Sequence, residues 1–216
     1  MSIAASLKKS KPSDEALRRF QLRRRIALAL LVGIIFTGLL FVRSPIAVDD
    51  VIHELIEAAG GVLIFAAILG RTWCTFYIGG RKSSEIVREG PYSVTRNPLY
   101  LFSAAGAAGV GAMTGSFTVA AGFAVLTAVA FYVVILVEED YLLQSFGEPY
   151  RQYMRETPRF FPRLGLFRES KLLAVKPRLL YRTFRDGLIF LAAYPFFEFV
   201  EYLQDIGVLH VILRLP

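Results

Sequence analysis

Three short stretches of the sequence carry residues suited to chemistry, and the first is REGPYSVTRNPLYLF, residues 88–102. It places Arg96, Asn97 and Tyr100 around Pro98, directly before an apolar run. Proline fixes its own φ and disfavours helix at the preceding residue, so Asn97-Pro98 forms a stiff connection that starts a helix. We expect this connection to hold a guanidinium, an amide and a phenol at a membrane surface. The same residues also suit a plain interfacial anchor, because arginine snorkels and tyrosine favours the aromatic belt.

The second stretch is the acidic triplet Glu138-Glu139-Asp140, which directly follows a long apolar run. Carboxylates at a boundary with anionic headgroups are electrostatically unfavourable, and ionisable groups at such boundaries often mark ligand paths. The triplet therefore predicts a cationic partner, either nearby arginines or a bound ligand.

The third stretch is FGEPYRQYMRETPRFFPR, residues 146–163, in which aromatic residues alternate with arginines and prolines. Tyr150, Tyr153 and Arg159 belong to this aromatic-arginine strip. Such a strip could stack on nucleic-acid bases, but beside a bilayer it is better suited to cover a planar ligand or to grip lipid headgroups.

Apolar helices must position these three stretches. The chain has 216 residues, of which 55% are hydrophobic, and a mean hydropathy of +0.49, which indicates an integral membrane protein. The first run follows basic residues, as in a secretory signal, but its polar lead of about 25 residues favours a retained anchor. We expect an all-α helical bundle with about four transmembrane helices, formed by the apolar runs Ile26–Val42, Val51–Leu69, Leu99–Thr114 and Phe117–Val137.

Lysine and arginine are distributed unevenly between the loops. Eight precede Ile26, five lie within residues 71–96 and ten within residues 151–185, whereas the two opposite loops carry only Arg43. By the positive-inside bias, all three basic segments are cytoplasmic, and four crossings allow this. The N-terminus and the three stretches are therefore predicted to share the cytoplasmic face.

The C-terminal part, residues 164–216, is predicted to be an amphipathic, membrane-associated extension. Its apolar run GLIFLAAYPFF, residues 187–197, is too short to cross a bilayer and is followed by acidic residues. An interfacial or re-entrant segment is therefore favoured over a fifth span. The expected organisation is a basic N-terminal segment 1–25, a membrane-embedded domain 26–163 and this extension.

Cysteine, histidine and net charge exclude several classes of function. A single cysteine, Cys74, allows no internal disulfide and no multi-cysteine zinc site. The two histidines, His53 and His210, are too scattered to suggest a metal, so no metal site is predicted. The net charge of +7 lies in segments that flank apolar runs, which indicates contact with anionic lipid and not with nucleic acid.

Taken together and in this order, the stretches resemble the membrane methyltransferases that include isoprenylcysteine carboxyl methyltransferases and phospholipid (phosphatidylethanolamine) N-methyltransferases. The pattern of that family is a GPY and R(H/N)PxY loop, a helical hairpin, a Glu-Glu pair, then FG..Y..Y and a PR..P segment. This chain has GPY at 90–92, RNPLY at 96–100, EE at 138–139, FG at 146–147 and PRFFP at 158–162. The match spans roughly half of the chain.

The resemblance implies a helical bundle without a Rossmann sheet that binds S-adenosyl-L-methionine at the cytoplasmic face. The implied acceptor enters from the bilayer and is a lipid or a lipidated group, either an isoprenylcysteine carboxylate or a phospholipid amine. Methyl transfer from a sulfonium needs alignment and desolvation more than a strong nucleophile. The oligomeric state is not predicted.

Carried over residue by residue, the resemblance implies both cofactor-binding and catalytic positions. The implied cofactor-binding residues are Asn97, Pro98, Tyr100, Glu138, Glu139, Tyr150, Tyr153 and Arg159. The two glutamates would accept hydrogen bonds from amino or ribose groups, and the strip would close over the adenosine and methionine parts. Arg96 and Asn97 are the implied catalytic positions, where Arg96 would orient an anionic group of the substrate.

Two positions depart from the pattern of the family. Asn97 stands where the carboxyl methyltransferase branch has His, which weakens the prenylcysteine assignment, and Phe102 stands where Gly often follows the Tyr. Phe102 therefore predicts a narrower pocket or a shifted helix.

Two other functions stay open. One is a nicotinamide-dependent reductase, since sterol reductases share a similar pattern in longer chains. The other is a non-catalytic membrane scaffold of the same fold.

Overall fold

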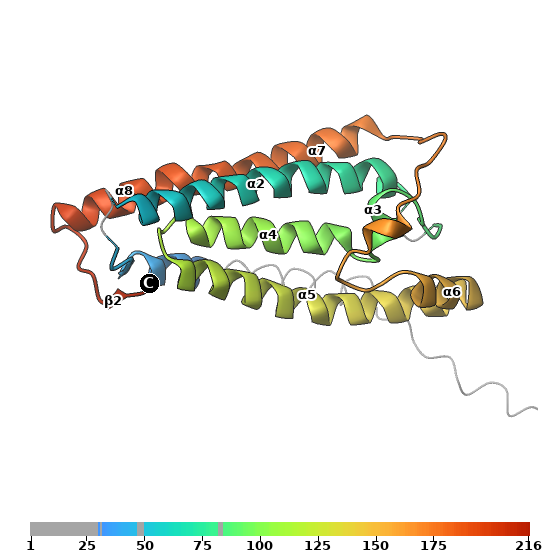
Figure 1. Ribbon diagram of the computed structural model, residues 1–216, viewed down its shortest axis with the longest axis horizontal. Coiled ribbons are helices and arrows are strands. Elements are labelled where there is room, and N and C mark those ends of the chain that lie inside the picture. Colours follow the sequence, from blue (N-terminus) through green and yellow to red (C-terminus); the bar gives the residue numbers. More distant parts are fainter. Residues whose placement is uncertain (1–29, 31, 47–49, 82–83) are drawn as a thin grey trace, which may run out of the picture.

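The computed structural model describes residues 30, 32–46, 50–81 and 84–216. The predicted basic segment 1–25 and the beginning of the first apolar run lie outside these residues. The described chain is mostly helical and forms an elongated bundle (Figure 1). The described part of the first apolar run is helical through 32–39 and leads into the two-residue strand β1 (Val42–Arg43).

Three helices form the centre of the bundle: α2 (Val51–Ile78), α4 (Pro98–Ala112) and α5 (Phe117–Phe146). Helix α4 packs against both α2 and α5 (Figure 1). Each helix begins where the sequence offers a start. The side chains of Asp50 and Ser116 accept hydrogen bonds from backbone N–H groups in the first turns of α2 and α5, and Pro98 occupies the first turn of α4.

Two helices of the described chain, α2 and α5, are long and apolar enough to cross a membrane. Helix α4 has 15 residues and is about 22 Å long, less than the roughly 30 Å of a hydrocarbon core. Helix α5 presents an apolar surface that no other element of the described chain covers. The exposed aliphatic side chains on it are Val125, Leu126, Val129, Val133, Leu136 and Val137.

Glycines allow α2 and α4 to approach each other closely. A Cβ atom on Gly109 would lie 2.7 Å from the backbone oxygen of Gly60, and one on Gly60 would lie 2.8 Å from Ala112 Cβ. A Cβ atom on Gly106 would lie 2.9 Å from Ala67. Small residues at a helix interface bring backbones together and increase van der Waals contact. This packing fixes the beginning of α4, and with it the Asn97-Pro98 connection, relative to the end of α2.

The helix α3 (Pro91–Val94), the helix α6 (Glu148–Glu156) and the 3-10 turn η1 (Leu164–Leu166) gather at one end of the bundle. Helix α2 ends at this end, α4 begins there and α5 ends there (Figure 1). The three stretches singled out in the sequence therefore meet at the same end of the molecule.

The C-terminal part, for which the sequence predicts an interfacial or re-entrant segment, is mostly helical. Helix α7 (Pro177–Leu188), the 3-10 turn η2 (Ile189–Ala192) and helix α8 (Ala193–Asp205) follow one another beside α2 (Figure 1). Gly187 packs on Ile68, and the hydroxyl of Thr75 donates a hydrogen bond to that of Thr183 at 3.2 Å, so direct contact with α2 holds α7 in place.

A two-stranded parallel pair modifies the all-α expectation. Strand β2 (Leu213–Arg214) pairs with β1, with Val42 opposite Leu213. The amide of Gln204 in α8 donates hydrogen bonds to the backbone oxygens of Leu40, at 2.9 Å, and Val42, at 3.2 Å. These contacts attach the C-terminal residues to the end of the bundle opposite α3 and α6 (Figure 1).

Candidate functional site

A narrow cavity of about 80 Å³ lies where α2 ends and α4 begins. Its walls come from the end of α2, the segment 85–87, the connection 92–100, the end of α5 and helix α6. The lining residues are Ile78, Glu85, Ile86, Val87, Tyr92, Arg96, Asn97, Leu99, Tyr100, Glu138, Glu139, Leu142, Tyr150 and Tyr153. Most of the polar ones come from the three stretches that the sequence singles out.

The first wall of the cavity is the connection between α2 and α4. Gly90 has a φ of +58°, and a Cβ atom there would lie 2.3 Å from the ring of Tyr77, so both the backbone and the packing require glycine. Pro91 then begins α3, which ends before Thr95. This sharp turn brings Arg96 and Asn97 to the cavity.

Hydrogen bonds join this connection to the aromatic-arginine strip. The backbone N–H of Arg96 donates to the Pro158 oxygen at 2.8 Å, and that of Arg163 donates to the Val94 oxygen at 3.0 Å. The Thr95 hydroxyl lies 3.1 Å from the backbone oxygen of Arg159. The two stretches thus form one unit, although more than 60 residues separate them in the chain.

Glu139, which is 4% exposed, is the residue on which the site converges. Arg159 donates hydrogen bonds to its Oε2 from Nη2 at 2.8 Å and from Nε at 3.0 Å. On the other oxygen, Oε1, lie Nη1 of Arg96 at 3.4 Å and Nδ2 of Asn97 at 3.5 Å. The cationic partner that the acidic triplet requires is therefore present in the fold, as two arginines from two different stretches.

The three acids of the triplet point in different directions, because successive residues of a helix are about 100° apart. Oε2 of Glu138 accepts a hydrogen bond from the Tyr100 hydroxyl at 2.7 Å and belongs to the cavity wall. Asp140 is exposed and accepts a hydrogen bond from Gln144 at 2.7 Å. Two of the acids therefore face the site and the third faces outward.

Helix α6 supplies two buried phenols. The Tyr153 hydroxyl donates a hydrogen bond to the backbone oxygen of Tyr92 at 2.7 Å, which ties α6 to α3. Burial raises the pKa of Tyr150 to about 12 and also raises the pKa of Tyr153 above its ordinary value. Both phenols are therefore neutral near pH 7, where they can donate hydrogen bonds and provide flat apolar surface.

Several buried polar atoms in the cavity wall lack a hydrogen-bond partner within the described chain. They are the Tyr92 hydroxyl and the Nε and Nη1 atoms of Arg96, of which Nη1 faces Glu139 as an ion pair without a hydrogen bond. Buried donors without acceptors are uncommon in native proteins and call for an explanation. The cavity thus offers donors suited to a carboxylate beside two carboxylates suited to an ammonium or a hydroxyl. This donor set fits a zwitterionic amino-acid group such as the methionine part of S-adenosyl-L-methionine.

Of the nine residues assigned to the site from the sequence, seven line the cavity: Arg96, Asn97, Tyr100, Glu138, Glu139, Tyr150 and Tyr153. Pro98 is fully buried at the start of α4, and Arg159 reaches the site through Glu139. Phe102 packs on Gly70 of α2 and is not among the lining residues. The phenylalanine therefore contributes to the contact between α2 and α4.

The sequence analysis did not assign Tyr92 or the segment 85–87 to the site. Tyr92 belongs to the Gly-Pro-Tyr motif, so the motif itself was a usable signal for it. No pattern in the sequence identifies Val87 as a site residue. It belongs to the segment that connects α2 to α3, and the fold brings it to the cavity.

Comparison with known proteins extends these observations. A model of the phospholipid methyltransferase family matches residues 58–149. The cobalt-zinc-cadmium resistance protein CzcN of Cupriavidus metallidurans is 35% identical to this chain over 214 residues, which is 98% of each chain. The chain belongs to the phospholipid methyltransferase family. Among the site residues, this family match includes Arg96 through Glu139 and ends before Tyr150, so the strip lies beyond it.

A second relative of the chain is named for the same type of role. The nickel-cobalt-cadmium resistance protein NccN of Alcaligenes xylosoxydans xylosoxydans is 37% identical over 187 residues, which is 86% of this chain and 87% of that relative. No solved structure matches the chain. Membership of the phospholipid methyltransferase family indicates a membrane methyltransferase, and the names of both relatives refer to metal resistance.

Proposed function

We propose that this protein is an S-adenosyl-L-methionine-dependent methyltransferase that acts on a lipid or lipidated acceptor at the cytoplasmic face of a membrane. The observation that carries the proposal is the convergence of Arg96, Asn97 and Arg159 on the carboxylate of Glu139 beside the cavity. This cavity lies at the common end of α2 and α5, the two helices suited to cross a bilayer. A water-soluble cofactor and a membrane-bound acceptor would therefore meet there.

Each polar group of the cavity has a proposed role. Arg96 and Tyr92 would hold the carboxylate of the methionine part, and Glu138 and Glu139 would accept hydrogen bonds from the ammonium or the ribose. When bound, the cofactor supplies a methyl group on a cationic sulfur. Tyr150 and Tyr153 would cover the adenosine and exclude water.

The cavity is too small to hold the cofactor without a movement of its wall. Its volume of about 80 Å³ is below the roughly 300–1,000 Å³ of most small-molecule sites. One wall must therefore move to admit a cofactor. The side chain of Arg159 is the proposed moving part, because it is 30% exposed and pairs with Glu139 in the cavity wall.

Cofactor binding tests the proposal. The purified full chain in detergent would be titrated with S-adenosyl-L-methionine by calorimetry, and in parallel with NADPH. We expect the first to bind and the second not to bind. Replacement of the cavity residue in Glu138→Gln should weaken binding at least tenfold, whereas Asp140→Asn, which alters the outward acid of the same triplet, should leave it unchanged. Equal affinity of the two variants would contradict the assigned site.

Transfer of a methyl group identifies the acceptor class. Membranes that contain the protein would be incubated with methyl-labelled cofactor, and labelled lipid would then be separated from labelled protein. Label in a phospholipid supports the amine acceptor, and base-labile label on protein supports a carboxylate ester. NADPH binding instead of S-adenosyl-L-methionine binding would favour the reductase alternative. A folded protein that binds neither would favour the scaffold.

We further propose that this methylation contributes to resistance to divalent metal cations, because both relatives are named for such resistance and are similar over most of the chain. A metal-sensitive bacterial host that expresses the protein should grow at higher concentrations of cobalt, zinc, cadmium or nickel salts. The Glu138→Gln variant should lose this advantage while Asp140→Asn keeps it. Equal growth of all strains would refute this role without affecting the proposed enzymatic activity.

A further inference from the structure

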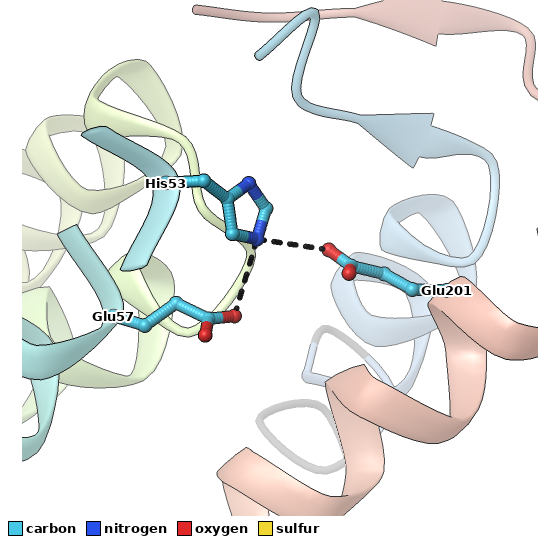
Figure 2. Close-up of side chains that lie close together, drawn as sticks. All are labelled: His53, Glu57 and Glu201. Atoms are coloured by element: carbon cyan, nitrogen blue, oxygen red, sulfur yellow. Dashed lines mark ion pairs between the residues drawn. The ribbon is translucent and has the colours of Figure 1, made fainter. Parts of the chain in front are cut away.

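A buried cluster of three ionisable side chains lies at the end of the bundle opposite the cavity. His53 and Glu57 come from the first two turns of α2, and Glu201 comes from α8 (Figure 2). The Nε2 atom of His53 is 3.3 Å from Oε1 of Glu57 and 3.6 Å from Oε1 of Glu201. The imidazole is 1% exposed, and the two carboxylate side chains are 15% and 11% exposed. One ring nitrogen thus faces two carboxylates inside the protein.

The Nε2 atom of His53 lies close to the carboxylates but is poorly aligned for hydrogen bonds. Neither ring nitrogen of His53 has a hydrogen-bond partner within the described chain, although Nε2 faces two carboxylate oxygens. The ring cannot easily turn, because it packs on the backbone of Gly115, where a Cβ atom would lie 2.0 Å from its Cε1. An imidazole that is held in place, almost fully buried and without a hydrogen-bond partner among the described residues therefore points its Nε2 at the two carboxylates.

The spacing of the donor atoms suits a metal ion. The three donor atoms all lie within 4.8 Å of one another. In a tetrahedral zinc site with bonds of about 2.0–2.1 Å, neighbouring donor atoms are about 3.3 Å apart. The distances of 3.3 and 3.6 Å from Nε2 to the two carboxylates are close to that separation.

The charge of the cluster also suits a dication. Two carboxyl groups face one imidazole in a buried place, where negative charge is unfavourable without compensation. Arg43, a cationic side chain that interacts electrostatically with Glu201, also forms an ion pair with Asp205 at 2.7 Å. A bound divalent cation would neutralise both carboxylates of the cluster.

We propose that His53, Glu57 and Glu201 bind one divalent transition-metal cation of the Zn²⁺ or Co²⁺ type. The ligands are Nε2 of His53 and one oxygen from each glutamate, with a fourth position left for water. An imidazole among the donors favours zinc, cobalt or nickel, because magnesium and calcium prefer sites made of oxygen alone. The three ligands come from α2 and α8, so the metal would also link these two helices.

A groove of about 560 Å³ lies beside the cluster, between α2 and the segment formed by η2 and α8. Glu57 belongs to its wall, and the exposed carboxylates of Glu54 and Glu198 lie beside it. A cleft lined by one sign of charge attracts the opposite ion. The groove therefore attracts a cation toward Glu57, one of the three ligands.

This inference does not depend on the proposed methyl transfer. His53, Glu57 and Glu201 all lie outside residues 58–149, which match the phospholipid methyltransferase family. His53 is also 25 residues from the end of α2 at Ile78, or about 38 Å along the helix. Metal binding and cofactor binding can thus be measured separately on the same preparation.

Metal titration of the full chain tests the proposal. The purified protein in detergent would be treated with a chelator, dialysed and titrated with Zn²⁺ by calorimetry, and bound metal would be counted by mass spectrometry. We expect one Zn²⁺ per chain, with affinity reduced at least tenfold in His53→Gln and in Glu201→Gln. His210→Ala is the matched control, because His210 is the other histidine of the chain and is exposed. This variant should bind Zn²⁺ with the same affinity as the wild type.

Two further measurements separate a metal site from a structural ion-pair cluster. Co²⁺ should give visible absorption bands typical of four-coordinate cobalt in the wild type and not in His53→Gln. Thermal unfolding would show whether each variant is folded. If His53→Gln does not fold, Glu57→Gln would be used in its place, because Glu57 is the most exposed of the three ligand side chains. Equal Zn²⁺ affinity of the wild type and a folded ligand variant would overturn the proposal, whatever the result of the cofactor titration.

Discussion

Arg159 donates two hydrogen bonds to a single oxygen of Glu139, from Nη2 at 2.8 Å and from Nε at 3.0 Å. The donor belongs to the irregular segment after α6, and the acceptor belongs to the last part of α5. Because the other oxygen of Glu139 faces Arg96 and Asn97, one carboxylate links three parts of the chain. The cavity end of the bundle is therefore held by a buried charge, and its stability should depend on that charge.

Replacement of this charge in Glu139→Gln should destabilise the protein. Arg96, whose side chain is 9% exposed, would be left buried without a counter-charge. Breaking a buried ion pair from one side typically costs about 3–5 kcal/mol, and the partial exposure of Arg159 places the expected loss near the lower end. We expect a clearly lower midpoint of thermal unfolding in detergent. Asp140→Asn is the control, and an unchanged midpoint in Glu139→Gln would show that Glu139 does not hold this end together.

The buried tyrosines predict a loss of stability in alkaline solution. Burial raises the pKa of Tyr92, Tyr150 and Tyr153, with Tyr150 at about 12, above the value of about 10 for an exposed tyrosine. Between about pH 10 and 12 the unfolded chain loses these protons while the folded chain keeps them. The free energy of unfolding should therefore be intact below pH 10 and fall above it, by at most about 1.4 kcal/mol per pH unit for each tyrosine.

Unfolding midpoints measured from pH 8 to pH 11 check this expectation. Tyr150→Phe removes one of the buried phenols and should make the decline above pH 10 shallower. Tyr141→Phe removes a phenol that is 55% exposed and should follow the wild-type curve. A decline of the same steepness in Tyr150→Phe and the wild type would contradict the role assigned to burial.

Two adjacent glycines of α2 should respond differently to alanine. At Gly60 a Cβ atom would lie 2.7 Å from Met113 and 2.9 Å from the backbone oxygen of Gly109, whereas at Gly61 it would meet nothing within 4 Å. Gly60→Ala should therefore push α4 away from α2 and lower the unfolding midpoint. Gly61→Ala should leave the midpoint unchanged or raise it slightly, since alanine favours helix over glycine by about 1 kcal/mol. A similar change in both variants would mean that α2 and α4 are not in close contact.

The sequence predicts those parts of the structure that depend on neighbouring residues. Long apolar runs predict α2 and α5, and the Asn97-Pro98 pair predicts the start of α4. The acidic triplet predicts a nearby cation because carboxylates next to an apolar run need compensation, and Arg96 and Arg159 lie against Glu139. Physical rules that act within a few residues were sufficient for these features.

The features that escaped prediction depend on contacts between distant residues. His53 and Glu201 are separated by 148 positions, so no local sequence pattern predicts the contact between them. Only the His53/Glu57 spacing of four, which places both side chains on one face of a helix, was visible in the sequence. The position of α7 and α8 beside α2 was missed for a similar reason, since hydropathy alone favoured an interfacial segment and did not reveal the contact between Gly187 and Ile68.

Phe102 is the departure from the family pattern whose effect can be measured directly. Its ring packs on Gly70, where a Cβ atom would lie 2.2 Å from Cδ1 of the ring. Gly70→Ala alone should clash with the ring, and Phe102→Ala alone should leave a cavity, with a cost of about 3 kcal/mol in the latter case. In the double variant the new methyl group occupies part of the space that the ring leaves. The two changes should therefore be non-additive, with a coupling of about 1–2 kcal/mol in a double-mutant cycle of unfolding free energies.

Phe102→Ala should also leave S-adenosyl-L-methionine affinity within about threefold of the wild type, because the ring is not part of the cavity wall. Additive effects, or a large change in affinity without a change in stability, would place Phe102 in the site instead of the helix interface.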